Sequence, residues 1–455
     1  MSHTPYLAYL DQHASEAQSL LETLCRQPSI AAQNVGIAEM ASLVENLFRE
    51  TGFTTQRLLV EGAPPVIYGE LRGRSPYTLL LYNHYDVQPA EPLDLWTSAP
   101  FEPMTRDGKL YARGVADNKA EIAARLTAIR ALLATNGGEL PITIRWIIEG
   151  EEEIGSPHFE SIAAKYADLL KADGALWEGS GFDDSGRAQL TLGTKGLLYV
   201  QLEVQGTGVD AHSGTASMLP SAAWRLVQAL AAIRSPEGRV RIPGFYDDVF
   251  TPSAEQRAAL ADQEDAEERM KAMYQVDQFV DGLTGQALRE RAAFSPTCNI
   301  AGLLSGYTGA GVKTVLPARA MAKIDFRLVP NQDPLAISIR LQDFLHANGY
   351  SDINVSVLGA AEPVVTPLDA PFVQRIATIA QDFAGKPPVI TPIMGGTLPL
   401  LGSLRRYVGL PGLSAPGNAS YWGSGAHAPN EHIRLADLER AVRYNCHMFQ
   451  SLGRQ

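Results

Sequence analysis

Short apolar runs alternate with helical patterns in the first part of the chain, and this alternation restricts the fold more than any other feature. Apolar runs at 66–71 and 78–82 precede a helical pattern at about 119–135, and another run follows at 142–148. This order predicts an α/β sheet that helices cover on both faces. Residues that carry chemistry should then lie just beyond the carboxyl ends of the strands.

The pattern changes after Gly193 and changes back near residue 361. Between these points a two-layer α+β unit is expected, with strands and helices at 197–204, 220–233, 321–328, 334–348 and 353–358. We therefore predict a discontinuous larger domain with a mostly parallel sheet, formed by 1–194 and 361–455, and a smaller inserted domain at 195–360. Charged helical patterns around 235–294 indicate a helical insertion in the smaller domain or a solvated face.

Composition and charge exclude several classes of function. The 455 residues include 38 Lys and Arg against 50 Asp and Glu, a net charge of −12, and no basic cluster lacks acidic neighbours. Nucleic acid and anionic membranes are therefore poor partners. The three cysteines are far apart, and neither a secretory pattern nor a long apolar run is visible. These features predict a cytoplasmic protein.

Four segments place metal-type ligands directly after apolar runs or glycine-containing turns: His84-Tyr-Asp86, Asp117-Asn118, Glu149-Gly-Glu-Glu-Glu153 and His427 in a glycine-rich loop. Taken alone, the first could be an ordinary hydrogen-bonded histidine, the second a helix N-cap and the third a solvated charge run. However, four glutamates within five residues after a buried strand repel one another, and a bound cation is the simplest explanation.

Together these ligands indicate one kind of metal centre. Carboxylates mixed with imidazoles and lacking thiolates suit a catalytic pair of zinc, manganese or cobalt ions better than a structural zinc. Two such ions can activate a water and polarise a scissile carbonyl, while a spare carboxylate moves the proton. The sequence therefore predicts hydrolytic chemistry.

These motifs resemble the dinuclear-zinc metallopeptidases that include carnosinase, cytosolic nonspecific dipeptidase, aminoacylase, glutamate carboxypeptidase and succinyl-diaminopimelate desuccinylase. The resemblance extends from His84 to Asn430, with several motifs in the family's order and at its spacings. The insertion at 235–294 and the segment 312–317 are most similar to the dipeptidase branch. The smaller domain would then be a lid and dimerisation domain.

The resemblance also implies roles for residues of the larger domain. Asp117 would bridge two metal ions, with His84 and Glu178 completing one site and Glu153 and His427 the other. Glu152 matches the family's general base and acid, and Asp86 the carboxylate behind the histidine ligand. The resemblance further implies a cis Asp117–Asn118 peptide bond.

In the smaller domain, the resemblance implies that His212 stabilises the oxyanion in the active site of a dimer partner. Arg327 and Asn331 match positions that bind the free carboxylate of the substrate, a role that suits a guanidinium group. Gly396 and Thr397, from the larger domain, would line the substrate pocket. A homodimer is therefore the expected assembly.

The predicted activity is metal-dependent hydrolysis of dipeptides or short peptides that have a free C-terminal carboxylate. Two alternatives stay open: an amidohydrolase for N-acyl or N-carbamoyl amino acids, and a non-catalytic binding protein with the same fold. The sequence does not separate the first alternative from a dipeptidase, because pocket shape and accommodation of a free amine decide between them.

Overall fold

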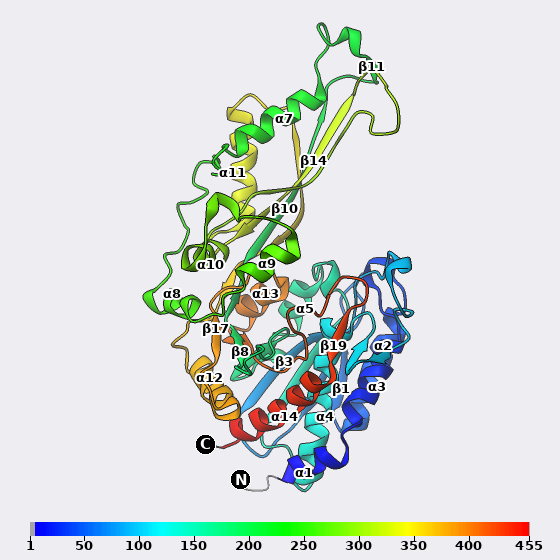
Figure 1. The fold of residues 1–455 in the computed structure, drawn as a ribbon, viewed down its shortest axis with the longest axis vertical. Coiled ribbons are helices and arrows are strands. Elements are labelled where there is room, and N and C mark those ends of the chain that lie inside the picture. Colours follow the sequence, from blue (N-terminus) through cyan, green and yellow to red (C-terminus); the bar gives the residue numbers. More distant parts are fainter. Residues whose placement is uncertain (1–4, 455) are drawn as a thin grey trace.

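The fold has two lobes built around separate sheets (Figure 1). The structure, a computed structural model, describes residues 5–454. The larger lobe contains an eight-stranded sheet. Its strands, in spatial order, are β1 (Thr54–Leu58), β2 (Val66–Leu71), β6 (Thr143–Glu149), β3 (Thr78–His84), β7 (Gly174–Trp177), β18 (Gly412–Ser414), β8 (Gln189–Thr191) and β17 (Val389–Thr391).

The centre of this sheet is parallel, as the sequence predicts. Strand β3 runs parallel to β6 and β7, and β7 runs parallel to β18. Antiparallel pairs occur toward the edges, at β1–β2, β2–β6 and β18–β8. The parallel strands therefore present their carboxyl ends along one border, where βαβ folds place functional residues.

Helices pack around the sheet of the larger lobe. Helix α4 (Ala120–Thr135) contacts α14 (Leu435–Leu452), and both also contact α2 (Glu16–Arg26). Most of α4 is buried, which explains why its apolar residues lie all around the helix. A second pair, α5 (Phe159–Lys165) and α13 (Pro399–Tyr407), packs together elsewhere on the lobe.

The smaller lobe is a four-stranded antiparallel sheet with helices on one face. Its strands, in spatial order, are β12 (Asn299–Ser305), β14 (Arg319–Leu328), β10 (Gly196–Gln205) and β15 (Asn354–Ala361). Even-numbered residues of β14 from Ala320 to Leu328 are buried, and α7 (Ala222–Ile233) and α11 (Pro334–Ala347) pack on the sheet. This period of two is the expected signature of a half-covered sheet.

The predicted insertion is helical, and it also contacts the larger lobe. It contains α8 (Ala254–Ala261), α9 (Glu267–Tyr274) and α10 (Gly285–Phe294). Leu260 and Phe294 form a small apolar cluster with Ile393, and the Gln263 amide donates a 2.9 Å hydrogen bond to Thr391 Oγ1. The insertion therefore connects the lobes instead of forming only a solvated face.

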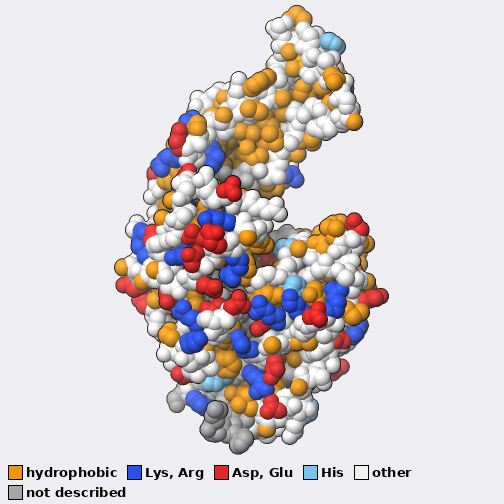
Figure 2. Space-filling model, viewed as in Figure 1, with side chains coloured by type: hydrophobic (Ala, Val, Ile, Leu, Met, Phe, Trp, Pro, Cys, Tyr) orange, Lys and Arg blue, Asp and Glu red, His pale blue; other side chains and the backbone are white. Residues whose placement is uncertain are grey.

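The surface of the two lobes differs. Figure 2 shows a hollow between the lobes, with charged side chains on the larger lobe and a mostly uncharged, partly hydrophobic surface on the upper part of the smaller lobe. Among the helices formed by residues 5–454, none is long and apolar enough to cross a membrane.

Candidate active site

The predicted ligands meet where chain segments leave the sheet of the larger lobe. His84 is the last residue of β3, and Glu178 follows the last residue of β7. Glu153 lies in a short turn after β6, and Asp117 lies in the irregular turn that precedes α4. His427 comes from the loop before the last helix, where its backbone has a left-handed φ of 64°.

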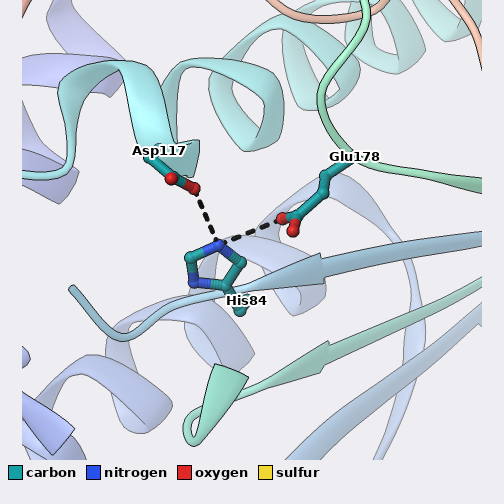
Figure 3. A group of neighbouring side chains, drawn as sticks. All are labelled: His84, Asp117 and Glu178. Atoms are coloured by element: carbon teal, nitrogen blue, oxygen red, sulfur yellow. Dashed lines mark hydrogen bonds and ion pairs between the residues drawn. The ribbon is translucent and has the colours of Figure 1, made fainter. Parts of the chain in front are cut away.

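The first trio consists of His84, Asp117 and Glu178 (Figure 3). His84 Nε2 lies 3.1 Å from Asp117 Oδ1 and 3.0 Å from Glu178 Oε2. His84 is fully buried, so its ring is fixed by packing as well as by these contacts. One imidazole and two carboxylates converge here, with one nitrogen or oxygen atom of each within 4.8 Å of the others, a spacing that suits the ligands of one metal ion.

The second trio shares Asp117 with the first. His427 Nε2 lies 3.1 Å from Asp117 Oδ2 and 3.1 Å from Glu153 Oε2. The two oxygens of Asp117 therefore face different histidines, which is the arrangement that a bridging carboxylate requires. The donor set of both trios, imidazole and carboxylate only, fits two divalent ions of the zinc or manganese type.

The charges of the two trios stabilise one another. Burial alone would raise the pKa of Asp117, but hydrogen bonds from His427 and His84 outweigh burial and hold that pKa below its usual value. Hydrogen bonds to Asp117 and Glu153 raise the pKa of His427 to about 10. The carboxylates thus attract positive charge, and a divalent cation can take the place of the imidazole protons.

Asp86 supports both the histidine ligand and the glutamate turn. Its Oδ1 lies 3.4 Å from His84 Nδ1, and its backbone oxygen lies 3.0 Å from the same nitrogen. Its carboxylate also accepts hydrogen bonds from the backbone N–H groups of Glu152 and Glu153, at 3.2 and 3.0 Å. Asp86 therefore fixes the position of three of the predicted site residues.

Glu152 lies beside the two trios without belonging to either. Burial raises its pKa well above the usual value, and the negative charge of Glu178 raises it further. A carboxyl group whose proton is held more tightly is suited to accept and return a proton near neutral pH.

Glu431 is a functional residue that the sequence did not reveal. It is almost fully buried, and its carboxylate accepts hydrogen bonds from the N–H groups of Gly114 and Ala116, both at 2.8 Å, and of Asp117 at 3.1 Å. The Arg113 guanidinium donates to it as well, at 2.8 Å. Glu431 thus joins the loop of His427 to the loop of Asp117, and no local sequence signal marks it for this role.

Asn118 is connected to the first trio by its peptide bond to Asp117 and also by its side chain. The Asp117–Asn118 peptide bond is cis, as the resemblance implies. The Asn118 side-chain amide donates to Glu178 and accepts from the Asn83 amide at 3.1 Å.

Two of the four predicted substrate residues, Arg327 and Thr397, meet where the lobes adjoin. Arg327, on β14 of the smaller lobe, donates from Nη1 to Thr397 Oγ1 of the larger lobe at 3.0 Å. The carbonyl of Gly396 accepts from the Lys195 N–H at 3.0 Å. Asn331 lies in a turn after β14 with a φ of 73°.

His212 lies in a different place. It ends β11 (Ala211–His212), which pairs with β13 (Val315–Leu316) at the far tip of the smaller lobe (Figure 1). Its side chain is exposed, and its Nδ1 accepts from the Gly214 N–H at 3.0 Å. The structure therefore does not bring His212 together with the two trios within one chain.

Known proteins are similar to this chain in both sequence and fold. The model of the peptidase family M20/M25/M40 matches residues 80–451. Human Beta-Ala-His dipeptidase is 30% identical over 382 residues, which cover 81% of this chain and 74% of that protein. Cys-Gly metallodipeptidase DUG1 of Candida albicans is 28% identical over 427 residues, with 88% and 86% covered.

Two solved structures are similar over nearly their whole length. The M20 family metallo-carboxypeptidase Sso-CP2 of Sulfolobus solfataricus has a TM-score of 0.91 at 35% identity, with 96% of this chain and 99% of that chain covered. Human carnosine dipeptidase 1 has a TM-score of 0.82 at 25% identity, with 99% of both covered. The chain therefore belongs to the peptidase family M20/M25/M40, and it is a metallopeptidase related to the family's dipeptidases.

Proposed function

We propose that the protein hydrolyses the amide bond of dipeptides or short peptides that have a free C-terminal carboxylate, with two divalent metal ions. One observation carries the proposal: the two oxygens of Asp117 face two complete ligand trios. The relatives named as Beta-Ala-His and Cys-Gly dipeptidases, and the neighbour named as a metallo-carboxypeptidase, support a peptide substrate.

His84, Glu178 and Asp117 would hold one ion, and Asp117, Glu153 and His427 the other. Zinc is our assignment, because imidazole and carboxylate ligands suit it, although manganese and cobalt accept the same donors. When bound, such a pair of ions lowers the pKa of water and polarises the scissile carbonyl.

Glu152 would act as the general base and then as the general acid. It takes the proton from the attacking water and returns it to the amine that leaves, so the same carboxyl group serves both halves of the reaction. The hydrogen bond from the Glu152 N–H to Asp86 fixes the turn that carries this carboxyl group.

Arg327 would bind the C-terminal carboxylate of the substrate. A guanidinium can donate two parallel hydrogen bonds to a carboxylate, and Arg327 already contacts Thr397 across the gap between the lobes. Asn331 and Gly396 would complete this subsite. Because the subsite contains residues of both lobes, it also couples substrate binding to the position of the smaller lobe.

His212 would act in the active site of a second copy of the chain. Its exposed position at the tip of the smaller lobe supports this role, since the fold gives it no path to the trios of its own chain. We therefore propose a homodimer in which His212 stabilises the oxyanion in the partner's site. The cytoplasmic location stays a prediction from the sequence.

A panel of substrates tests the proposal. The protein is treated with a chelator, then given zinc, manganese or cobalt, and assayed with free dipeptides and with N-acetyl and N-carbamoyl amino acids. Metal-dependent cleavage of the dipeptides is the expected result. Cleavage of only the blocked amino acids would favour the amidohydrolase alternative, and no metal-dependent turnover would favour the binding protein.

A further inference from the structure

A cavity of about 250 Å³ adjoins the first trio. Asp117 and Glu178 form part of its wall, and Met394 and Leu398 form another part. Sites that enclose a whole small molecule usually measure about 300–1,000 Å³. This cavity is smaller, so it suits one part of a substrate whose reacting bond lies at the metal ligands.

The polar groups at the floor of the cavity are already paired inside the protein. The buried Ser180 donates from its N–H to Ser414 Oγ at 2.8 Å, and its own hydroxyl lies 3.4 Å from Thr191 Oγ1. The Asn418 side chain accepts from the Ser420 N–H at 3.1 Å and donates to a backbone carbonyl at 3.4 Å. The floor therefore offers a neutral surface with few free hydrogen-bonding groups.

The cavity also lacks a free charge. All its lining side chains are uncharged except Asp117 and Glu178. Both carboxylates are engaged by His84, and Glu178 also accepts from Asn118. A charged group that entered the cavity would lose its water without gaining an opposite charge of its own, which is unfavourable.

The position of the cavity indicates which part of a substrate enters it. Thr397 contacts Arg327, the residue assigned to the C-terminal carboxylate, whereas Met394 lies on the same loop and faces the cavity beside the trio. For a peptide held by Arg327 with its scissile carbonyl at the trios, the acyl side begins at Asp117 and Glu178, which form part of the cavity wall. The side chain of the acyl residue is the group that such a cavity can receive.

We propose that this cavity binds the side chain of the residue on the acyl side of the scissile bond, that it selects uncharged side chains, and that Met394 is a specificity-determining residue. The proposal rests on the proposed function and adds a substrate class: peptides whose acyl residue has a neutral side chain.

Two pairs of dipeptides that differ almost only in charge test this selection. Norleucyl-alanine and lysyl-alanine differ by a terminal methyl or ammonium group, and glutaminyl-alanine and glutamyl-alanine differ by an amide or carboxylate. We expect kcat/KM to be at least about tenfold higher for the neutral member of each pair, because an unpaired polar group costs about that much on burial. Equal values within each pair would overturn the proposal.

Two variants at Met394 test whether the cavity causes the selection against charged acyl side chains. Met394→Glu supplies a carboxylate and should raise kcat/KM for lysyl-alanine relative to norleucyl-alanine at least about tenfold. Met394→Gln has a similar shape without the charge and should leave that ratio near the wild-type value. If Met394→Glu leaves the ratio unchanged, Met394 does not face the acyl side chain.

The result also separates this proposal from the proposed function. Cleavage of both members of each pair at equal rates would retain the peptidase activity and reject the selective cavity. If no dipeptide is cleaved, the proposed function fails, and calorimetric binding of norleucine amide and lysine amide, which lack the free carboxylate assigned to Arg327, to the zinc-loaded protein decides the cavity. Tighter binding of norleucine amide would support the neutral cavity, and equal or weaker binding would reject it.

Discussion

The two lobes contribute to the site in different ways. In the larger lobe, five predicted ligands from distant parts of the sequence are linked around Asp117 by four contacts of 3.0–3.1 Å between histidine nitrogens and carboxylate oxygens. In the smaller lobe, Arg327 reaches only Thr397, and His212 lies exposed at the distal tip. In the proposed mechanism the ligands thus come from one lobe, whereas substrate binding would also require the second lobe, and oxyanion stabilisation a second chain.

This difference follows from how each set of residues is held. In the larger lobe, strand ends and hydrogen bonds to the buried Asp86 and Glu431 fix the predicted ligands from within the lobe itself. Arg327 lies on the four-stranded sheet and His212 on the separate β11–β13 pair of a lobe that the chain enters near Gly196 and leaves near Ala361. Substitutions in the two lobes should therefore have distinguishable effects.

The largest loss is expected for Asp117→Asn, because it weakens both metal sites at once. Activity should fall by more than about 10⁴-fold, which exceeds what general acid–base catalysis alone supplies. Metal analysis after dialysis should show less than two ions per chain. A variant that keeps both ions and most of its activity would contradict the bridging role.

Glu152→Gln should lower kcat by about 10²–10⁴-fold while metal content and folding stay unchanged, because it removes only the proton transfer. The neighbouring Glu151, which pairs with His158 at 2.9 Å, offers a matched control. Glu151→Gln should retain most activity. If both variants were equally active, the base would have to be another residue.

His212→Ala should lower kcat by about 10²–10³-fold, as loss of an oxyanion-stabilising donor does, with little change in Tm since the side chain is exposed. Mixing Glu152→Gln and His212→Ala chains should restore part of the activity, because one site of the mixed dimer is complete. Proven subunit exchange without recovery would argue against action across the dimer.

Arg327→Met should raise KM by roughly 10- to 100-fold and change kcat less, because it removes a charge-assisted hydrogen bond to the substrate. Arg327→Lys, which keeps the charge without the guanidinium fork, should lie between wild type and Arg327→Met. A main effect on kcat would move Arg327 from substrate binding to the chemical step.

The smallest effect, a change in how Tm depends on pH, is expected when Glu149 is replaced. Glu149 is a buried carboxyl group of the larger lobe outside both trios. Burial raises its pKa to about 8, and Tyr82 and Ser156 donate to it at 2.8 and 2.9 Å. From pH ~4.3, the usual value in unfolded chains, up to pH 8 the folded chain holds a proton that the unfolded chain has lost. The contribution of Glu149 to the free energy of unfolding is therefore fully present at low pH. It declines as the pH rises from ~4.3 to about 8.

Glu149→Gln keeps a neutral hydrogen-bonding group and removes this titration. With a chelator present, Tm should decline less between pH 5 and 8 in the variant than in wild type, by roughly 2–4 °C. Equal slopes would show that Glu149 is ionised in the folded chain.

Much of the fold could be predicted from the sequence because its signals are local. The apolar run at 66–71 coincides with β2, and the helical pattern at 119–135 agrees with α4 to within one residue. Four of the predicted ligands, His84, Asp117, Glu153 and His427, could be singled out because each follows an apolar run or a glycine-containing turn, whereas Glu178 was implied only by the resemblance. The mostly parallel sheet follows from the alternation of strands and helices.

The residues that make long-range contacts are not marked by local patterns in the sequence. Glu431 is a single acidic residue in a loop, and only the folded chain shows that three N–H groups of another loop converge on it. The attachment of the insertion to the larger lobe through Leu260 and Ile393 depends on tertiary packing. The distance between His212 and the trios is likewise a property of the lobe arrangement and not of any motif.

Anomalous X-ray diffraction from crystals of the zinc-loaded protein tests the central claim most directly. The account predicts two peaks about 3.5–4 Å apart, one beside His84 and Glu178 and the other beside Glu153 and His427, with Asp117 between them. A single peak, or two peaks that do not share Asp117, would contradict the dinuclear site on which the proposed function depends.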